Sequence, residues 1–95
     1  MPDQSKITVA YPYQVVATVT VDPDSVPGNT SSFETVTVKG LNDTQLIVAD
    51  LPDLEAGLVL RSARVTADDT LTYEIVNVTG DAVNPASQTL KVVAL

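Results

Sequence analysis

The acidic side chains are the residues of this sequence whose types and spacing could support chemistry. Calcium requires about six to eight oxygen ligands, and aspartates from converging loops of a β protein can supply them. None of the acidic groups has the Asp-x-Asp-x-Asp-Gly spacing of a dedicated calcium loop. Aspartate also favours turns, because its carboxylate hydrogen-bonds the local backbone. We therefore interpret these residues as turn residues and expect no calcium or other metal site. They are Asp22, Asp24, Asp50, Asp53, Glu55, Asp68, Asp69 and Asp81.

Two of these carboxylates could in principle perform acid–base hydrolysis. Glycosidases hold such a pair at a defined separation across a cleft, and a chain of 95 residues has little material left to build one. The sequence contains no Cys and no His, which removes thiol nucleophiles, disulfides and the commonest general base and metal ligand. We predict no catalytic residues and no cofactor, and a protein that is not an enzyme but binds other protein surfaces.

Arg61 and Arg64 are candidate partner-binding residues. They stand three apart in one expected strand, so we expect their side chains to point to opposite faces. One of them is placed to pair with Glu74 on the neighbouring strand, and the other to reach a partner protein. The formal net charge of −7 repels phosphate groups, so we expect binding neither to nucleic acids nor to anionic membrane surfaces.

The elements that must position these residues are β-strands. Apolar and polar residues alternate with a period of two, and clusters of Pro, Gly, Asn and Asp separate the alternating segments. The sequence therefore predicts an all-β protein, a small antiparallel β-sandwich or barrel of six to eight strands, Ig-like or jelly-roll-like. The predicted strands are 15–21, 34–39, 45–49, 58–67, 71–79 and 88–95.

Local predictions follow from the same patterns. The apolar run at 46–49 predicts burial on both faces, either within a sandwich or at a subunit contact. Residues 26–32 read as a surface loop, and residues 52–56 as a single helical turn. In the strand at 58–67, the residues expected on one face are Val59, Ala63, Val65 and Ala67. In the strand at 88–95, we expect Leu90, Val92 and Ala94 to point inward.

Residues 1–14 differ from the rest of the chain. Apolar residues alternate with polar or small ones, but Pro12 interrupts the run and restricts Tyr11 to extended geometry. We predict an extended N-terminal arm, followed by a single domain at 15–95. The arm either packs on its own domain or adds a strand to the exposed edge of a neighbour. Its candidate partner-binding residues are Ile7, Val9, Tyr11, Pro12 and Tyr13.

Targeting signals are not visible in the sequence. No stretch approaches the roughly 20 apolar residues that span a membrane, and the first residues lack a basic segment followed by an apolar one. We therefore expect a protein that is made and used without export.

An ordered set of strand and turn segments runs through most of the chain after residue 15. The segments are VTVDPDSV (19–26), ETVTVKGL (34–41), LEAGL (54–58), ARVTA (63–67), IVNVTG (75–80) and NPAS (84–87). In this order they resemble the capsid decoration, or cement, proteins and other small head-associated proteins of tailed bacteriophages and prophages. These segments are strands and turns, so the resemblance carries no active-site motif.

The resemblance implies a structural protein that binds the major capsid protein on the outer surface of the assembled head and stabilises the shell. It places the protein on the virion, assembled in the host cytoplasm. The small core of a 95-residue domain also favours a homotrimer or another small cyclic oligomer. The alternatives are a tail-fibre or head-fibre domain, and an Ig-like adhesion or carbohydrate-binding module. Three Tyr and no Trp give the carbohydrate alternative few aromatic platforms.

Overall fold

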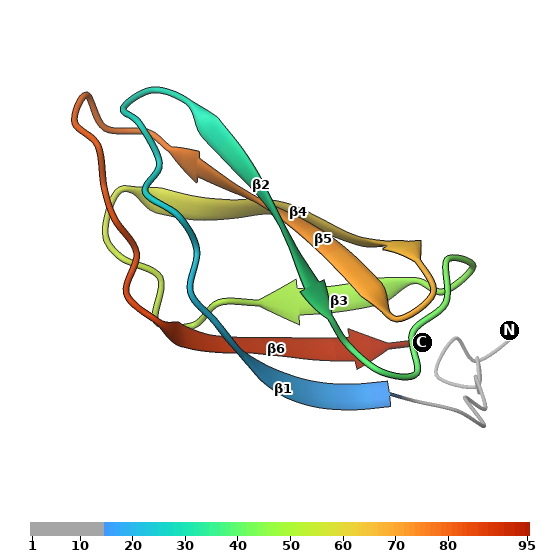
Figure 1. The fold of residues 1–95 in the computed structure, drawn as a ribbon. Coiled ribbons are helices and arrows are strands. Elements are labelled where there is room, and N and C mark those ends of the chain that lie inside the picture. The colour runs from blue at the N-terminus through green and yellow to red at the C-terminus, as the bar shows by residue number, and fades with distance from the viewer. Residues whose placement is uncertain (1–14) are drawn as a thin grey trace, which may run out of the picture.

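The computed structural model describes residues 15–95, which form two three-stranded antiparallel sheets (Figure 1). One sheet has the strand order β1-β6-β3, and the other has the order β2-β5-β4. No helix occurs within this range. The prediction of an all-β protein with antiparallel strands is therefore confirmed. The strands are β1 (Val15–Val21), β2 (Ser31–Thr37), β3 (Ile47–Asp50), β4 (Leu58–Ala67), β5 (Thr70–Asn77) and β6 (Gln88–Ala94).

The chain passes between the two sheets at almost every connection. Only β4 and β5 are both consecutive and paired, and they are joined by a tight turn in which Asp69 has a φ of 59°. The last strand, β6, lies between β1 and β3. Val15 of β1 and Ile47 of β3 both stand opposite Ala94 of β6, so β1 and β3 begin at the same end of their sheet.

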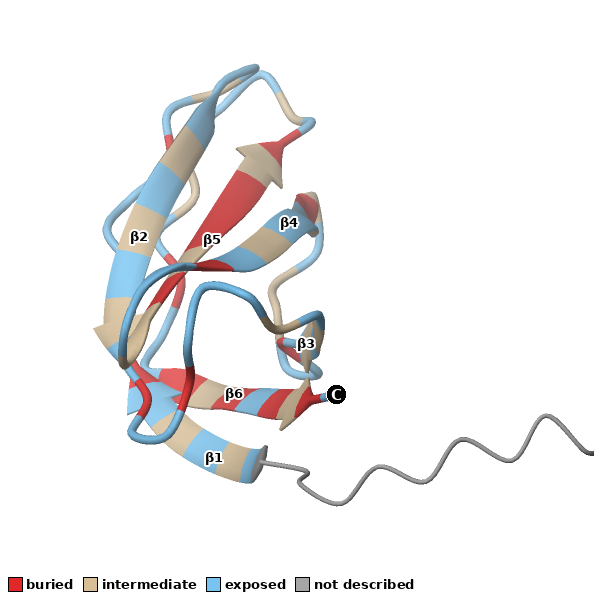
Figure 2. Ribbon diagram, turned by 90° about the vertical axis from the view of Figure 1, so that its right-hand side faces the viewer, coloured by how far each residue is buried: buried red, intermediate tan, exposed pale blue. Residues whose placement is uncertain are grey.

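The core lies between the sheets and is built mainly by the two central strands (Figure 2). Ile75 on β5 and Leu90 on β6 are 0% exposed. Burying one such side chain stabilises a fold by roughly 1.5–3 kcal/mol. The other buried apolar residues of the strands are Val21, Leu58, Val65, Leu71, Tyr73, Val92 and Ala94. The alternation predicted for the last strand, with Leu90, Val92 and Ala94 inward, is thus confirmed.

The face predicted for the strand at 58–67 is confirmed for Ala63 and Val65. It is wrong for Val59 and Ala67, which are exposed, because β4 contains irregularities in its pairing with β5. The register shifts between Leu60 and Ser62, where Arg61 is an extra residue. Such a bulge reverses the alternation of side chains along a strand. Leu60 and Ala63 therefore both pack against the core, whereas Val59 is 49% exposed.

The segment predicted as the surface loop 26–32 is partly buried. Val26 is 0% exposed and exchanges two backbone hydrogen bonds with Val83, at 2.9 and 3.1 Å. Asn29 then donates to the carbonyl of Thr79, and β2 begins earlier than expected, at Ser31. The loop is ordered by the β5–β6 connection beside it, a partner that local sequence does not reveal.

Residues 52–56 do not form the predicted helical turn. Two separate turns occur here, closed by hydrogen bonds from Leu54 N to Leu51 O and from Leu58 N to Glu55 O, both 3.1 Å. Gly57 has a φ of 87°, a conformation that ends any helical run and is tolerated best by glycine. The segment is therefore a loop that carries the chain from one sheet to the other.

Asn77 closes β5 with a fully satisfied amide. Its Nδ2 donates to the carbonyls of Val26 and Asp81, at 2.9 and 2.8 Å. Its Oδ1 accepts hydrogen bonds from the backbone N–H of Thr79 at 2.8 Å and from the Thr79 hydroxyl at 2.7 Å. This buried side chain therefore joins the β1–β2 and β5–β6 loops at one end of the molecule.

Candidate protein-interaction surfaces

Two of the carboxylates singled out in the sequence, those of Asp69 and Glu55, accept hydrogen bonds from segments that are distant in the chain. Asp69 Oδ1 accepts a hydrogen bond from the backbone N–H of Gly40, at 2.8 Å. The Glu55 carboxylate accepts from the backbone N–H of Ala86 at 2.6 Å and from Gln88 Nε2 at 3.1 Å. Within residues 15–95, no group of three or more acidic side chains is placed to hold a metal ion.

The five arm residues predicted to bind a partner lie outside the part of the chain that the structure describes. They are Ile7, Val9, Tyr11, Pro12 and Tyr13.

The ion pair predicted between one of the two arginines and Glu74 is confirmed, and Arg61 forms it. Its Nε donates to Glu74 Oε1 at 3.0 Å, and the Ser62 hydroxyl lies 3.3 Å from the same oxygen. The Arg61 side chain is 67% exposed, whereas that of Glu74 is only 4% exposed. The pair therefore holds a buried carboxylate on the outer face of the β2-β5-β4 sheet.

The prediction that Arg61 and Arg64 point to opposite faces is wrong. Arg61 contacts Glu74, and Arg64 stands opposite Thr72, which shares its face of β5 with Glu74. The bulge at Arg61 supplies the extra residue that places both arginines on one face. Phe33 of β2 lies opposite Glu74 on the same face and is 62% exposed.

The outer face of the other sheet carries a patch of exposed apolar side chains, which we call the apolar patch. The strand register places Val16 of β1, Val93 of β6 and Val48 of β3 side by side. A hydrogen bond of 2.9 Å from Leu95 N to Leu46 O continues this register by one more row. Exposed fractions reach 70% at Val16, 76% at Leu46 and 62% at Val48. The members of the apolar patch are Val16, Leu46, Val48, Val93 and Leu95.

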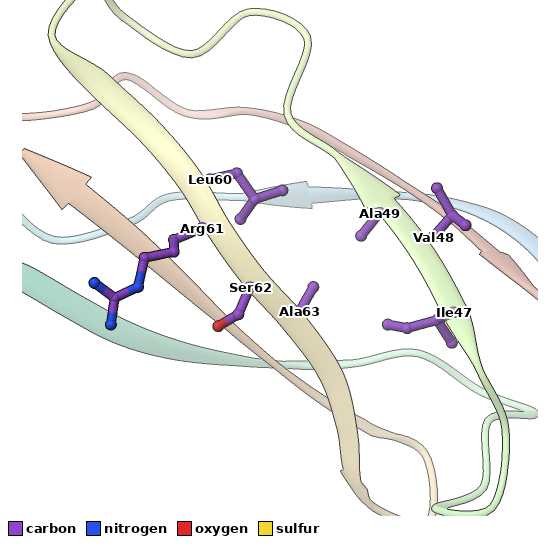
Figure 3. A pocket seen from close by; sticks show the side chains of 7 residues that line it. All are labelled: Ile47, Val48, Ala49, Leu60, Arg61, Ser62 and Ala63. Carbon is purple, nitrogen blue, oxygen red and sulfur yellow. The ribbon is translucent and has the colours of Figure 1, made fainter.

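A groove of about 250 Å³ separates β3 from β4 (Figure 3). Ile47 and Ala49 point from β3 toward Leu60 and Ala63 of β4. All four side chains face the core, yet each is only half-buried. The core is therefore open along this side of the molecule, where the free edges of the two sheets meet.

The apolar patch was not predicted from the sequence, although the apolar run at 46–49 was a signal for it. Burial on both faces within the sandwich is wrong for this run, because Leu46 and Val48 are exposed. Its second interpretation, a subunit contact, stays a prediction. Phe33 and the buried state of Glu74 were also missed, since neither follows from the alternation of a single strand.

No protein-family model, no curated protein and no solved structure shows a significant match to this chain. Residues 15–95 include no helix of the length and apolar character needed to cross a lipid bilayer.

Proposed function

We propose that this protein is a non-enzymatic structural protein of a tailed bacteriophage, which binds the outer surface of the assembled head and stabilises it. The apolar patch is the observation that carries the proposal. Val16, Leu46 and Val48 are each more than 60% exposed and lie together on one sheet face. A contiguous apolar area on a small protein is characteristic of a surface that binds another protein. The resemblance of residues 19–87 to head-associated proteins supplies the class of partner, the major capsid protein.

The charge of the chain supports an external position. With a net charge of −7, the protein repels the packaged nucleic acid and does not compete for it. A shell also repeats the same contact at many symmetry-related positions. Modest individual contacts can therefore stabilise the shell strongly when they act together.

The proposal includes a finer description of the fold and its assembly. The two sheets form a sandwich of the Ig-like or jelly-roll-like kind, with residues 1–14 as an extended arm. The protein acts on the virion as a homotrimer or another small cyclic oligomer. Analytical ultracentrifugation at micromolar concentrations tests the oligomer, because a strictly monomeric protein contradicts it.

A binding experiment with phage heads tests the function. Heads of the phage that carries the gene, prepared without this protein, are mixed with the purified chain and examined by co-sedimentation and electron cryomicroscopy. We expect saturable binding to the outer surface and heads that rupture at a higher temperature. Density on tails or fibres would support the fibre alternative, and glycan binding without head binding would support the adhesion module.

Substitutions on one sheet face provide a matched control. Val48→Asp puts a charge into the apolar patch, whereas Thr20→Asp puts the same charge at the polar end of the same face. We expect Val48→Asp to weaken binding to heads at least about tenfold, which is about 1.4 kcal/mol. Thr20→Asp should bind like the parent chain. Equal binding by both variants would remove the apolar patch as the contact surface.

A further inference from the structure

The outward edge of β3 has unpaired main-chain groups. The hydrogen bond from Leu95 N to Leu46 O sets the phase of the β3–β6 ladder. In an antiparallel pair, hydrogen-bonded and non-hydrogen-bonded positions alternate. Val48 therefore bonds to β6, while the N–H and C=O groups of Ile47 and Ala49 point to the open edge. Such an edge is a template for another strand.

The groove beside this edge fits a strand better than a small molecule. Its volume of about 250 Å³ lies below the roughly 300–1,000 Å³ of typical ligand pockets. The side chains that point into it are apolar, namely Ile47, Ala49, Leu60 and Ala63 (Figure 3). Val48, Arg61 and Ser62 also line the groove, with their side chains directed away from it. A strand added to β3 would place alternate side chains over the apolar side chains of the groove and the others in solvent.

We propose that residues 6–9 of a second copy of this chain add antiparallel to β3, with Ile7 and Val9 in the groove. The four residues match the four of β3 in length. In the register that places Ile7 opposite Ala49, Val9 stands opposite Ile47. Lys6 then stands opposite Asp50, both facing solvent. Ile7 thus pairs with the small Ala49. Lys6 pairs with the oppositely charged Asp50, and opposite charges stabilise a cross-strand pair.

The length of chain before β1 favours a second copy over the same molecule. In this register Val9 lies three strand spacings from Val15, a direct distance of about 14 Å. The hydrogen-bonded pair of Leu46 and Leu95 occupies that path. The connecting chain would therefore have to pass over one face of the sheet. Because packed sheets lie about 10 Å apart, rising above the sheet and returning adds about 5 Å each way, which gives a path of about 24 Å. Six fully extended residues span only about 20–22 Å.

Each copy would then donate an arm and accept one. This contact is heterologous, so it closes into a ring when the rotation between copies permits. The inference deepens the arm and the oligomer of the proposed function, but it does not depend on binding to heads, because it concerns copies of this chain in solution and is tested without heads.

Disulfide trapping tests the contact directly, since the chain has no natural cysteine. Two single variants, Ile7→Cys and Ala49→Cys, are mixed and oxidised, and products are separated by mass. Opposed residues in neighbouring strands lie within disulfide range. We expect the mixed disulfide between the two variants as the main product. Val48→Cys, whose side chain points away from the groove, replaces Ala49→Cys as the matched control and should give at least about fivefold less product.

The double variant, with both cysteines in one chain, distinguishes the two arrangements. At high dilution we expect it to remain reduced or to form linked oligomers. A rapid internal disulfide in a monomer would overturn the inference in favour of the chain's own arm. Absence of the mixed disulfide at every concentration would overturn it entirely.

A charge exchange tests the register independently of cysteine chemistry. Lys6→Glu should weaken self-association several-fold in sedimentation, and addition of Asp50→Lys to the same chain should restore it. Ile7→Asp should abolish association, whereas Thr8→Asp, on the solvent side of the added strand, should leave it. Association that is unchanged in Ile7→Asp would contradict the proposal.

Discussion

The sequences of β3 and β5 predict that the edge strand β3 is the more buried of the two, but the structure shows that the central strand β5 is. Residues 46–49 are continuously apolar, which predicts a strand buried on both faces, whereas β5 alternates like a half-buried strand. In the structure β5 is mostly buried, including the charged Glu74, and β3 exposes Val48 by 62%. Position in the sheet therefore decides burial more than side-chain type does.

The neighbours of each strand explain the difference. β5 has β2 on one side and β4 on the other, and side chains such as Arg61 fold over its outer face. β3 has only β6 beside it. A strand with one neighbour can be buried further only when another chain or segment covers it. The inferred arm of a second copy would cover the open edge of β3 and its groove side, whereas Val48 points away from the groove.

Truncation of matched isoleucines should give the largest effect. Ile75→Ala empties a fully buried site on β5 and should lower the free energy of unfolding by about 2–5 kcal/mol. Ile47→Ala, at a half-buried site on β3, should cost less than half as much. Urea unfolding at low protein concentration, followed by circular dichroism, measures both. Equal losses would show that β3 contributes to the core as fully as β5.

Removal of a cationic side chain from the strand beside β5 or from the strand beside β3 should have a smaller effect on stability. Arg61→Ala leaves the buried Glu74 carboxylate without its ion pair and should cost about 1–2 kcal/mol. Lys91→Ala removes the cation opposite the exposed Asp50 and should change stability by less than about 0.5 kcal/mol. Thermal unfolding of both variants at neutral pH provides the comparison. A larger loss in Lys91→Ala would contradict the contrast between the strands.

Alkaline pH should weaken β5 through Tyr73. Burial raises the pKa of Tyr73 to about 12, and the charges of Glu34, Asp22 and Asp24 add to the rise. The ordinary value is about 10, so the folded state holds the proton more tightly than the unfolded state. The resulting stability is complete below about pH 10 and is lost as the pH rises toward 12.

Ultraviolet absorbance of ionised tyrosine, recorded against pH, measures this titration. The difference between the parent chain and Tyr73→Phe should rise near pH 12. If the absorbance difference rose near pH 10 instead, Tyr73 would not be protected from solvent.

Acid pH should have the smallest effect, at the loop that follows β3. The backbone N–H of Ala86 is the main cause of the lowered pKa of Glu55, with Gln88 contributing. A lowered pKa adds stability above the unfolded value, and this stability is lost as the pH falls through the folded value. Glu55→Gln should cost less than about 1 kcal/mol at pH 7 and make unfolding less sensitive to pH as the pH falls below the ordinary carboxyl pKa of about 4.3. An unchanged acid titration in Glu55→Gln would rule out this contribution.

Much of the fold could be predicted from period-two alternation. It located five of the six strands, because each buries one face against the core, and it identified Leu90, Val92 and Ala94 as inward. The remaining strand, β3, was located from its continuous apolar run. Alternation could not locate the bulge at Arg61, since an extra residue has no local signature in a polar and apolar mixture. Nor could it show that Val26 is buried, because the partner of that residue, Val83, is distant in sequence.

The candidate surfaces were less predictable, because they too depend on a bulge and on partners that are distant in sequence. The pairing of one of the two arginines with Glu74 followed from adjacent strands joined by a short turn, and it is confirmed for Arg61. The common face of Arg61 and Arg64 depends on the bulge. The apolar patch depends on which strands share a sheet, and that order places β6 between two strands far from it in sequence.

The position of β6 has a consequence for how the chain folds in a cell. β1 and β3 both hydrogen-bond to β6 and not to each other, and β6 follows every other strand in the chain. A ribosome therefore releases both strands before their common partner exists, so their edges are exposed to chaperones and to other nascent chains. Pairing of strands this distant in sequence also slows folding, toward the millisecond-to-second range of all-β domains.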